Sequence, residues 1–354
     1  MRQLNRMRLR TAQPGEERPK PLRRLPSARE EWTVTLFSLW FLAGLYVDGW
    51  AHNHLSSTLE TFFTPWHAIF YSGYLVLSLS LLAIVWRNKR RTGGDWFTSI
   101  PVGYGWSLIG AGIFAFGGLG DMAWHIVFGI EANLEALLSP THLMLATGLF
   151  LMVTGNLRAW WARQTPIGVP KLREQLPMIL SLCMTLSVMT FMTQFAHYVK
   201  VYASVPQPLF PQQEISMALG IAGYLLQTAV MMGCIFMILK RARLARGTLF
   251  LFIVLNAAAM DWMRDGLSFL PAAAITAFMA EYSARNLYPL EQHLREFRAF
   301  AFAIPALFFN LYFVTLALQD GIWWTVHVWA GSIVMAGIAG LLLSFVAVPM
   351  EEGA

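Results

Sequence analysis

Long apolar segments alternate with short polar ones along almost the whole chain. Each apolar segment extends for roughly 20 residues, which is the length an α-helix needs to cross the hydrocarbon core of a bilayer. We expect such helices at residues 32–51, 66–87, 100–125, 140–162, 176–199, 215–240, 247–265, 271–287, 297–318 and 322–348. The pattern therefore predicts an all-α fold, a polytopic membrane bundle of about ten transmembrane helices.

The N-terminal segment lacks this pattern. It is rich in Arg, Pro and Glu and contains no apolar run. A segment of this composition cannot bury enough apolar surface to fold by itself, and a cleavable signal peptide would need an apolar stretch that is missing here. We expect a basic, disordered cytoplasmic tail at residues 1–30 and a single transmembrane domain at residues 31–349.

Composition and charge indicate how this bundle is oriented in the membrane. Hydrophobic residues make up 56% of the chain and charged residues only 13%, against about 25% in soluble domains. The net charge of +6 comes from Lys and Arg in the N-terminal tail and in alternate loops. Because such loops stay in the cytoplasm, we expect a multi-pass protein of the cell membrane with both termini cytoplasmic. The bilayer accounts for the positive charge, so no nucleic-acid partner is expected.

Two parts of the chain carry the same spaced set of polar residues. The first set is Asp48, His52, Glu60 and His67, and the second is Asp121, His125, Glu135 and His142. The sets lie in helical hairpins at residues 31–90 and 100–163, and we expect residues 175–349 to form further hairpins. Successive two-helix hairpins enter the membrane in the same direction, which predicts parallel repeats about an axis along the membrane normal.

The spacing within each set favours metal binding. Asp and His four residues apart share one face of a helix, and the Thr-Pro and Ser-Pro pairs before the last His are typical of helix starts. Each hairpin would thus bring three ligands together at its extracytoplasmic end. We expect six metal ligands: Asp48, His52, His67, Asp121, His125 and His142. Glu60 and Glu135 are candidate further ligands or general bases.

Carboxylates and imidazoles together are ligands of iron, copper, zinc and manganese, and two sets suffice for a dinuclear centre. Iron–sulfur clusters are disfavoured, because both cysteines lie inside apolar segments. We expect a membrane-bound oxidoreductase of the oxygenase or oxidase type, with iron or copper, acting on an apolar or lipid substrate. Four alternatives stay open: a zinc-dependent lipid hydrolase, a metal-ion transport or handling protein, a structural subunit whose polar residues form ion pairs, and a b-type haem held by His67 and His142.

Overall fold

The computed structural model describes residues 23–55, 64–129, 134–163, 169–200, 202–204, 211–241, 243–319 and 321–349, and all regular structure in these ranges is helical. The α-helices of the first half are α1 (Ala28–His54), α2 (Pro65–Thr92), α3 (Gly105–Phe128), α4 (Leu134–Leu138), α5 (Pro140–Val153) and α6 (Gly155–Trp161). Those of the second half are α7 (Leu172–Met192), α8 (Gln212–Arg241), α9 (Thr248–Met263), α10 (Leu270–Ala284), α11 (Leu294–Gln319) and α12 (Val326–Ala347). Short 3₁₀ turns are η2 (Gln194–Ala196), η3 (Tyr198–Lys200), η4 (Leu267–Phe269) and η5 (Leu290–Gln292).

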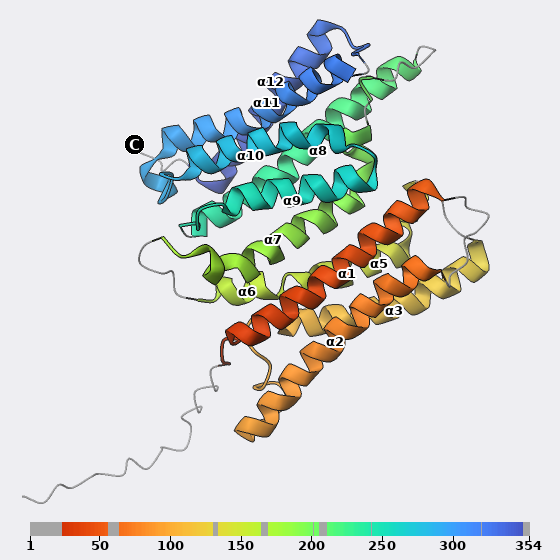
Figure 1. Ribbon diagram of the computed structural model, residues 1–354, viewed down its shortest axis with the longest axis vertical. Helices are drawn as coiled ribbons and strands as arrows, with labels where there is room; N and C mark the ends of the chain where they lie inside the picture. Colours follow the sequence, from red (N-terminus) through yellow and green to blue (C-terminus); the bar gives the residue numbers. More distant parts are fainter. Residues whose placement is uncertain are drawn as a thin grey trace, which may run out of the picture.

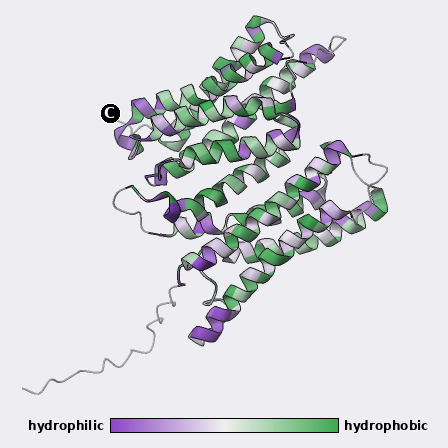
Figure 2. Cartoon of the chain, in the orientation of Figure 1, coloured by the Kyte–Doolittle hydropathy of each residue, from purple (hydrophilic) through white to green (hydrophobic). Residues whose placement is uncertain are grey.

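Every apolar segment predicted from the sequence coincides with a helix or a pair of helices. Within the described ranges, 8 helices are long and apolar enough to cross a membrane, or up to 9 if the bent pair α5 and α6 forms one span. The helix α9 has 16 residues and is shorter than these. Figure 2 shows hydrophobic residues along the helices and hydrophilic residues mainly near their ends. The fold is therefore a helical bundle typical of a multi-pass membrane protein, while the count of ten spans and the side of the termini stay predictions.

Several helix boundaries differ from the prediction; for example, α7 ends at Met192, and the expected span 176–199 continues into the turns η2 and η3. Two of the differences have a clear physical reason. The first helix begins at Ala28, because Ser27 and Glu30 form a capping box that starts the helix before the apolar segment. The predicted tail overlaps this start, and its residues 1–22 lie outside the described ranges.

The expected span 140–162 is bent by 44° between α5 and α6. At the bend, the Thr154 hydroxyl donates to the carbonyl of Phe150 (2.7 Å), and the Arg158 guanidinium donates to the carbonyl of Leu151 (2.8 Å). The Phe150 carbonyl also accepts the backbone N–H of Thr154 (3.2 Å), so side chains supplement the backbone hydrogen bonds where the helix is interrupted.

The central helix of the bundle is α7, which lies between α1 and α9 in Figure 1. Of its most apolar 18-residue window, 78% is buried. One end contributes Ile179 and Leu182 to a core shared with the second half of the chain, and the other contributes Val188 and Phe191 to a core shared with the hairpins α1–α2 and α3–α5. The helix α7 therefore joins the two halves.

Close contacts between glycines and the opposing backbone hold α1 against α2. A Cβ atom on Gly44 would lie 2.6 Å from the Cα of Phe70, and one on Gly73 would lie 2.5 Å from the Cα of Phe41. Neither position has room for a larger residue, as is common where membrane helices approach closely.

The hairpin α3–α5 repeats these contacts at equivalent positions. A Cβ atom on Gly117 would lie 3.2 Å from the backbone nitrogen of Leu145, and one on Gly148 would lie 2.8 Å from that of Phe114. Gly117 and Phe114 follow Gly44 and Phe41 at the same interval that separates Asp121 from Asp48. The sequence repeat is thus also a repeat of helix packing.

Candidate metal centre

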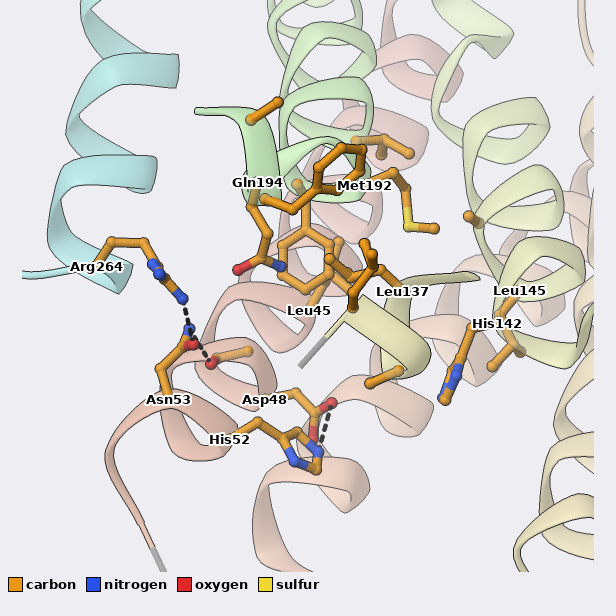
Figure 3. A pocket seen from close by; sticks show the side chains of 18 of the residues that line it. Leu45, Asp48, His52, Asn53, Leu137, His142, Leu145, Met192, Gln194 and Arg264 are labelled. Atoms are coloured by element: carbon orange, nitrogen blue, oxygen red, sulfur yellow. Dashed lines mark hydrogen bonds and ion pairs between the residues drawn. The ribbon is translucent and has the colours of Figure 1, made fainter. Parts of the chain in front are cut away.

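The first set of predicted ligands meets where α1 ends and α2 begins. Asp48 and His52 lie one turn apart on α1, and His67 lies in the first turn of α2. The Nε2 atom of His67 is 3.4 Å from Oδ1 of Asp48, and the Nε2 atom of His52 is 3.8 Å from Oδ2 (Figure 3 shows Asp48 and His52). The carboxylate therefore lies between two imidazoles. We call these three residues the first triad.

The second set meets in the same way between α3 and α5. The Nε2 atom of His125 is 3.4 Å from Oδ2 of Asp121, and the Nε2 atom of His142 is 3.3 Å from Oδ1. The two imidazole centroids are 5.8 Å apart, against 5.5 Å in the first triad. These three residues form the second triad, and its geometry closely matches that of the first.

The distances suit a transition-metal ion. In each triad one ligand atom from every residue lies within 4.8 Å of the other two. Two ligands about 2.1 Å from one ion lie about 3.0 Å apart at an octahedral angle and about 3.4 Å apart at a tetrahedral angle, near the separations of 3.3–3.8 Å seen here. Among the described residues the six donors thus form two groups of three, one per hairpin, rather than a single group of six.

Hydroxyl groups at the helix starts orient one histidine of each triad. Thr64 caps α2 and its Oγ1 lies 2.9 Å from Nδ1 of His67, while Ser139 caps α5 and its Oγ lies 2.6 Å from Nδ1 of His142. A neutral imidazole that donates its Nδ1–H to this hydroxyl has its Nε2 lone pair available for an ion held between the imidazole and the aspartate. This is the usual outer-shell support of a metal-binding histidine.

The second triad has two further supporting contacts. The hydroxyl of Thr141 donates to Oδ1 of Asp121 at 2.9 Å, and Nδ1 of His125 lies 3.2 Å from the carbonyl of Gly129, to which it can donate. Asp121 is only 3% exposed. In the first hairpin Trp66 takes the position equivalent to Thr141, so this hydroxyl contact belongs to the second triad.

Both triads line one cavity with a volume of about 800 Å³. Its walls come from α1, α2, α3, α4, α5, α7, α8 and the turns η2 and η3, with Leu45 and Met192 among the apolar residues (Figure 3). The volume lies within the range of about 300–1,000 Å³ typical of small-molecule sites. Both triads are therefore accessible from the same cavity.

Tyr71 is a residue of this site that the sequence pattern did not reveal. It lines the cavity, and its phenol is close enough to interact electrostatically with both Asp48 and Asp121. Gly118 leaves room for the ring, since a Cβ there would lie 3.3 Å from the phenol oxygen. The available signal was its position four residues after His67, but the repeat hid it, because Ala146 stands there in the second copy.

The two predicted glutamates have different outcomes. Glu60 lies outside the described residues. Glu135 lies in α4 with an exposed side chain, and it belongs neither to the donors of the second triad nor to the lining of the cavity. Its role in proton transfer stays a prediction.

The chain matches no protein-family model, no curated protein and no solved structure. The function is therefore inferred from the two triads and the cavity that both of them line.

Proposed function

We propose that this chain is an integral membrane metalloenzyme of the oxidoreductase class, with one transition-metal ion in each triad. The single observation that carries the proposal is the pair of two-histidine, one-aspartate triads on the wall of one partly apolar cavity. Nearby carboxylates and imidazoles are costly in a membrane protein, and two matching sets point to a shared function.

The composition of each triad favours iron. Two histidines and one carboxylate on one face of an ion are the ligands of non-haem Fe(II) oxygenases, and they leave open positions for dioxygen or substrate. In a hydroxylation, one oxygen atom of dioxygen enters a C–H bond, and an external donor supplies two electrons and two protons that reduce the other atom to water. Copper and manganese suit the same donor atoms less specifically, and zinc would support hydrolysis of a lipid ester or amide instead.

The protein itself would supply ligands, an apolar surface for the substrate and a proton donor. Asp48 and Asp121 would provide negative charge that balances bound cations, and apolar residues such as Leu45 and Met192 would contact an apolar substrate. The phenol of Tyr71, near both carboxylates, is placed to donate a proton to either site.

An arrangement with about ten spans and cytoplasmic termini is part of the proposal. Its support is the clustering of Lys and Arg beside alternate helix ends, such as Arg87 and Lys89 to Arg91 at the end of α2 away from His67. Both triads then lie at the extracytoplasmic ends of their helices, where an apolar substrate can enter from the outer leaflet.

Metal analysis of the protein purified in detergent tests this function. We compare the wild type, His67→Ala, His142→Ala and the double variant, with His327→Ala as a matched control, since His327 is exposed and does not line the cavity. Each single variant should lose about half of the bound metal, the double variant nearly all of it, and the control none.

Equal metal content in the wild type and the double variant would refute the metal sites. Stoichiometric iron or copper would support oxidation. Stoichiometric zinc would overturn the assignment to oxidoreductases and favour a hydrolase.

A further inference from the structure

Two basic side chains line the cavity together with the acidic triads. Lys200 ends η3, and Arg264 follows the last turn of α9. In Figure 3 Arg264 and His142 stand at opposite edges of the pocket, with Asn53 close to Arg264. Metal ligation does not require these cations, so their presence in the cavity needs another explanation.

Lys200 and Arg264 are near enough to interact electrostatically, and within the part of the chain that the structure describes no carboxylate forms an ion pair with either of them. The charge of Arg264 acts on Lys200, and together with burial, the larger cause, it lowers the pKa of the Lys200 ammonium. Placing like charges near one another is unfavourable unless an anion joins them. This arrangement is typical of an anion-binding site.

The neighbouring groups leave bonding capacity for such an anion. Arg264 donates one hydrogen bond to the amide oxygen of Asn53 (2.6 Å), a neutral acceptor. The exposed carboxylate of Asp265 interacts electrostatically with Arg264, but its ion pair is with His54, whose Nε2 lies 2.6 Å away. Within the described ranges, neither Lys200 nor Arg264 forms an ion pair, and the Lys200 ammonium forms no hydrogen bond. A guanidinium beside an ammonium suits a carboxylate or phosphate group, which can accept two parallel bonds from arginine.

The remainder of the cavity suits a hydrocarbon chain. Apolar side chains of α1, α7 and α8 contribute to its lining, among them Leu45, Val188, Phe191, Leu219 and Leu226. A volume of about 800 Å³ is much larger than a carboxylate or phosphate group requires. A cavity with a charged wall and an apolar wall suits an amphiphile, whose headgroup would contact the first and whose hydrocarbon chain would contact the second.

We propose that the cavity binds an amphiphile with an anionic headgroup, a carboxylate or a phosphate, held by Arg264 and Lys200. The hydrocarbon part then occupies the apolar wall and faces the triads. That this amphiphile is the substrate rests on the proposed metalloenzyme function, whereas its binding does not depend on metal.

Binding is therefore measured on metal-free, chelator-treated protein in nanodiscs of zwitterionic lipid, with empty nanodiscs as the blank. The probes are a long-chain fatty carboxylate, the alkyl phosphate and alcohol of equal chain length, and inorganic phosphate and acetate as competitors. The variants are Arg264→Gln, Lys200→Gln and Arg264→Lys, with Arg285→Gln as the control, because Arg285 is exposed and does not line the cavity.

The expected result is that an anionic probe binds at least about tenfold more tightly than the alcohol. Each Gln variant should weaken binding of the anionic probe by about tenfold or more and leave the alcohol unchanged, Arg264→Lys should retain most of the binding, and the control should match the wild type. The carboxylate and phosphate probes then identify the preferred headgroup. Lys200→Gln changes an exposed side chain, so it carries the test even if Arg264→Gln fails to fold.

Equal binding of alcohol and anion, or equal losses for both in the Gln variants, would overturn the proposal. Displacement of the probe by inorganic phosphate or acetate at similar concentrations would also overturn it, in favour of a small-anion site. The double variant with His67→Ala and His142→Ala separates the two proposals. If it loses metal but binds the amphiphile as the wild type does, the amphiphile site does not depend on the metal sites.

Discussion

The hydrogen bond from Thr141 to Asp121 offers a sharp test of the second triad. The substitution Thr141→Val keeps the branched shape of the side chain and removes only the hydroxyl that donates to Oδ1 of Asp121 at 2.9 Å. Because Asp121 is buried, water cannot readily replace this donor. The change therefore leaves all three donor residues in place and frees the carboxylate to rotate.

Two effects follow, and their sizes can be estimated separately. A hydrogen bond to a charged group contributes about 1.5–3 kcal/mol, so the metal-free variant should be less stable by up to that amount. Metal affinity depends on how well the carboxylate is held in its binding orientation, and loss of an outer-shell partner typically weakens it by about 10–100-fold. This range equals about 1.4–2.7 kcal/mol in binding free energy.

Titration of the metal-free protein with Fe(II) under anaerobic conditions, in competition with a chelator, measures this effect. The wild type should show two tight sites, and Thr141→Val should show one unchanged site and one weakened site. Thr147→Val is the matched control, since it makes the same substitution on α5, where the Thr147 hydroxyl donates only to the carbonyl of Leu143. Two unchanged sites in Thr141→Val would refute the assignment of the second triad.

Three further variants test packing, protonation and capping through the apparent Tm in detergent. Gly73→Ala would place a methyl group 2.5 Å from the Cα of Phe41 and should destabilise the protein by about 1–3 kcal/mol. Gly112→Ala is the control, since a Cβ there would have no atom within 4 Å, and it should not destabilise the protein. Equal Tm values for the two variants would contradict the close helix contact. Burial lowers the pKa of His197 to about 3, so the folded protein favours the neutral imidazole. The contribution of His197 to stability is therefore fully present above about pH 6.5 and is lost as the pH falls toward 3. At pH 5 the loss in the free energy of unfolding is roughly 2 kcal/mol. His197→Phe should flatten the Tm curve between pH 7 and 5, and a curve parallel to that of the wild type would exclude this source of acid sensitivity. Ser139→Ala removes the cap of α5 and should cost about 1 kcal/mol, with weaker metal binding at His142; unchanged values for both would show that the hydroxyl has no supporting role.

Local spacing explains why much of the site could be predicted from the sequence. Asp48 and His52 share a helix face by periodicity alone, and the short hairpin connection brings the start of α2 to the end of α1. The second copy confirmed that this pattern was not accidental. Hydropathy located the helices in the same way, because each apolar segment is continuous in the sequence.

The other parts of the site depend on contacts that no local pattern encodes. Arg264 follows α9 and Lys200 ends η3, and they reach the cavity because both α7 and α9 pack against α1. Tyr71 belongs to one hairpin but serves both carboxylates, so it has no counterpart in the repeat. The bend before α6 likewise depends on Arg158, whose partners include the distant carbonyl of Gly103.

The glycine contacts also make the geometry of each triad independent of the loop above it. Gly44 lies one turn before Asp48, and Gly73 lies two turns after His67, so direct backbone packing fixes the distance between the ligands. The two hairpin connections differ in length by two residues, yet the corresponding separations in the triads agree to within 0.4 Å (3.8 and 3.4 Å; 3.4 and 3.3 Å). Insertions and deletions in these loops should therefore be tolerated during evolution, which leaves the loops free to diversify while the ligands beneath them stay in register.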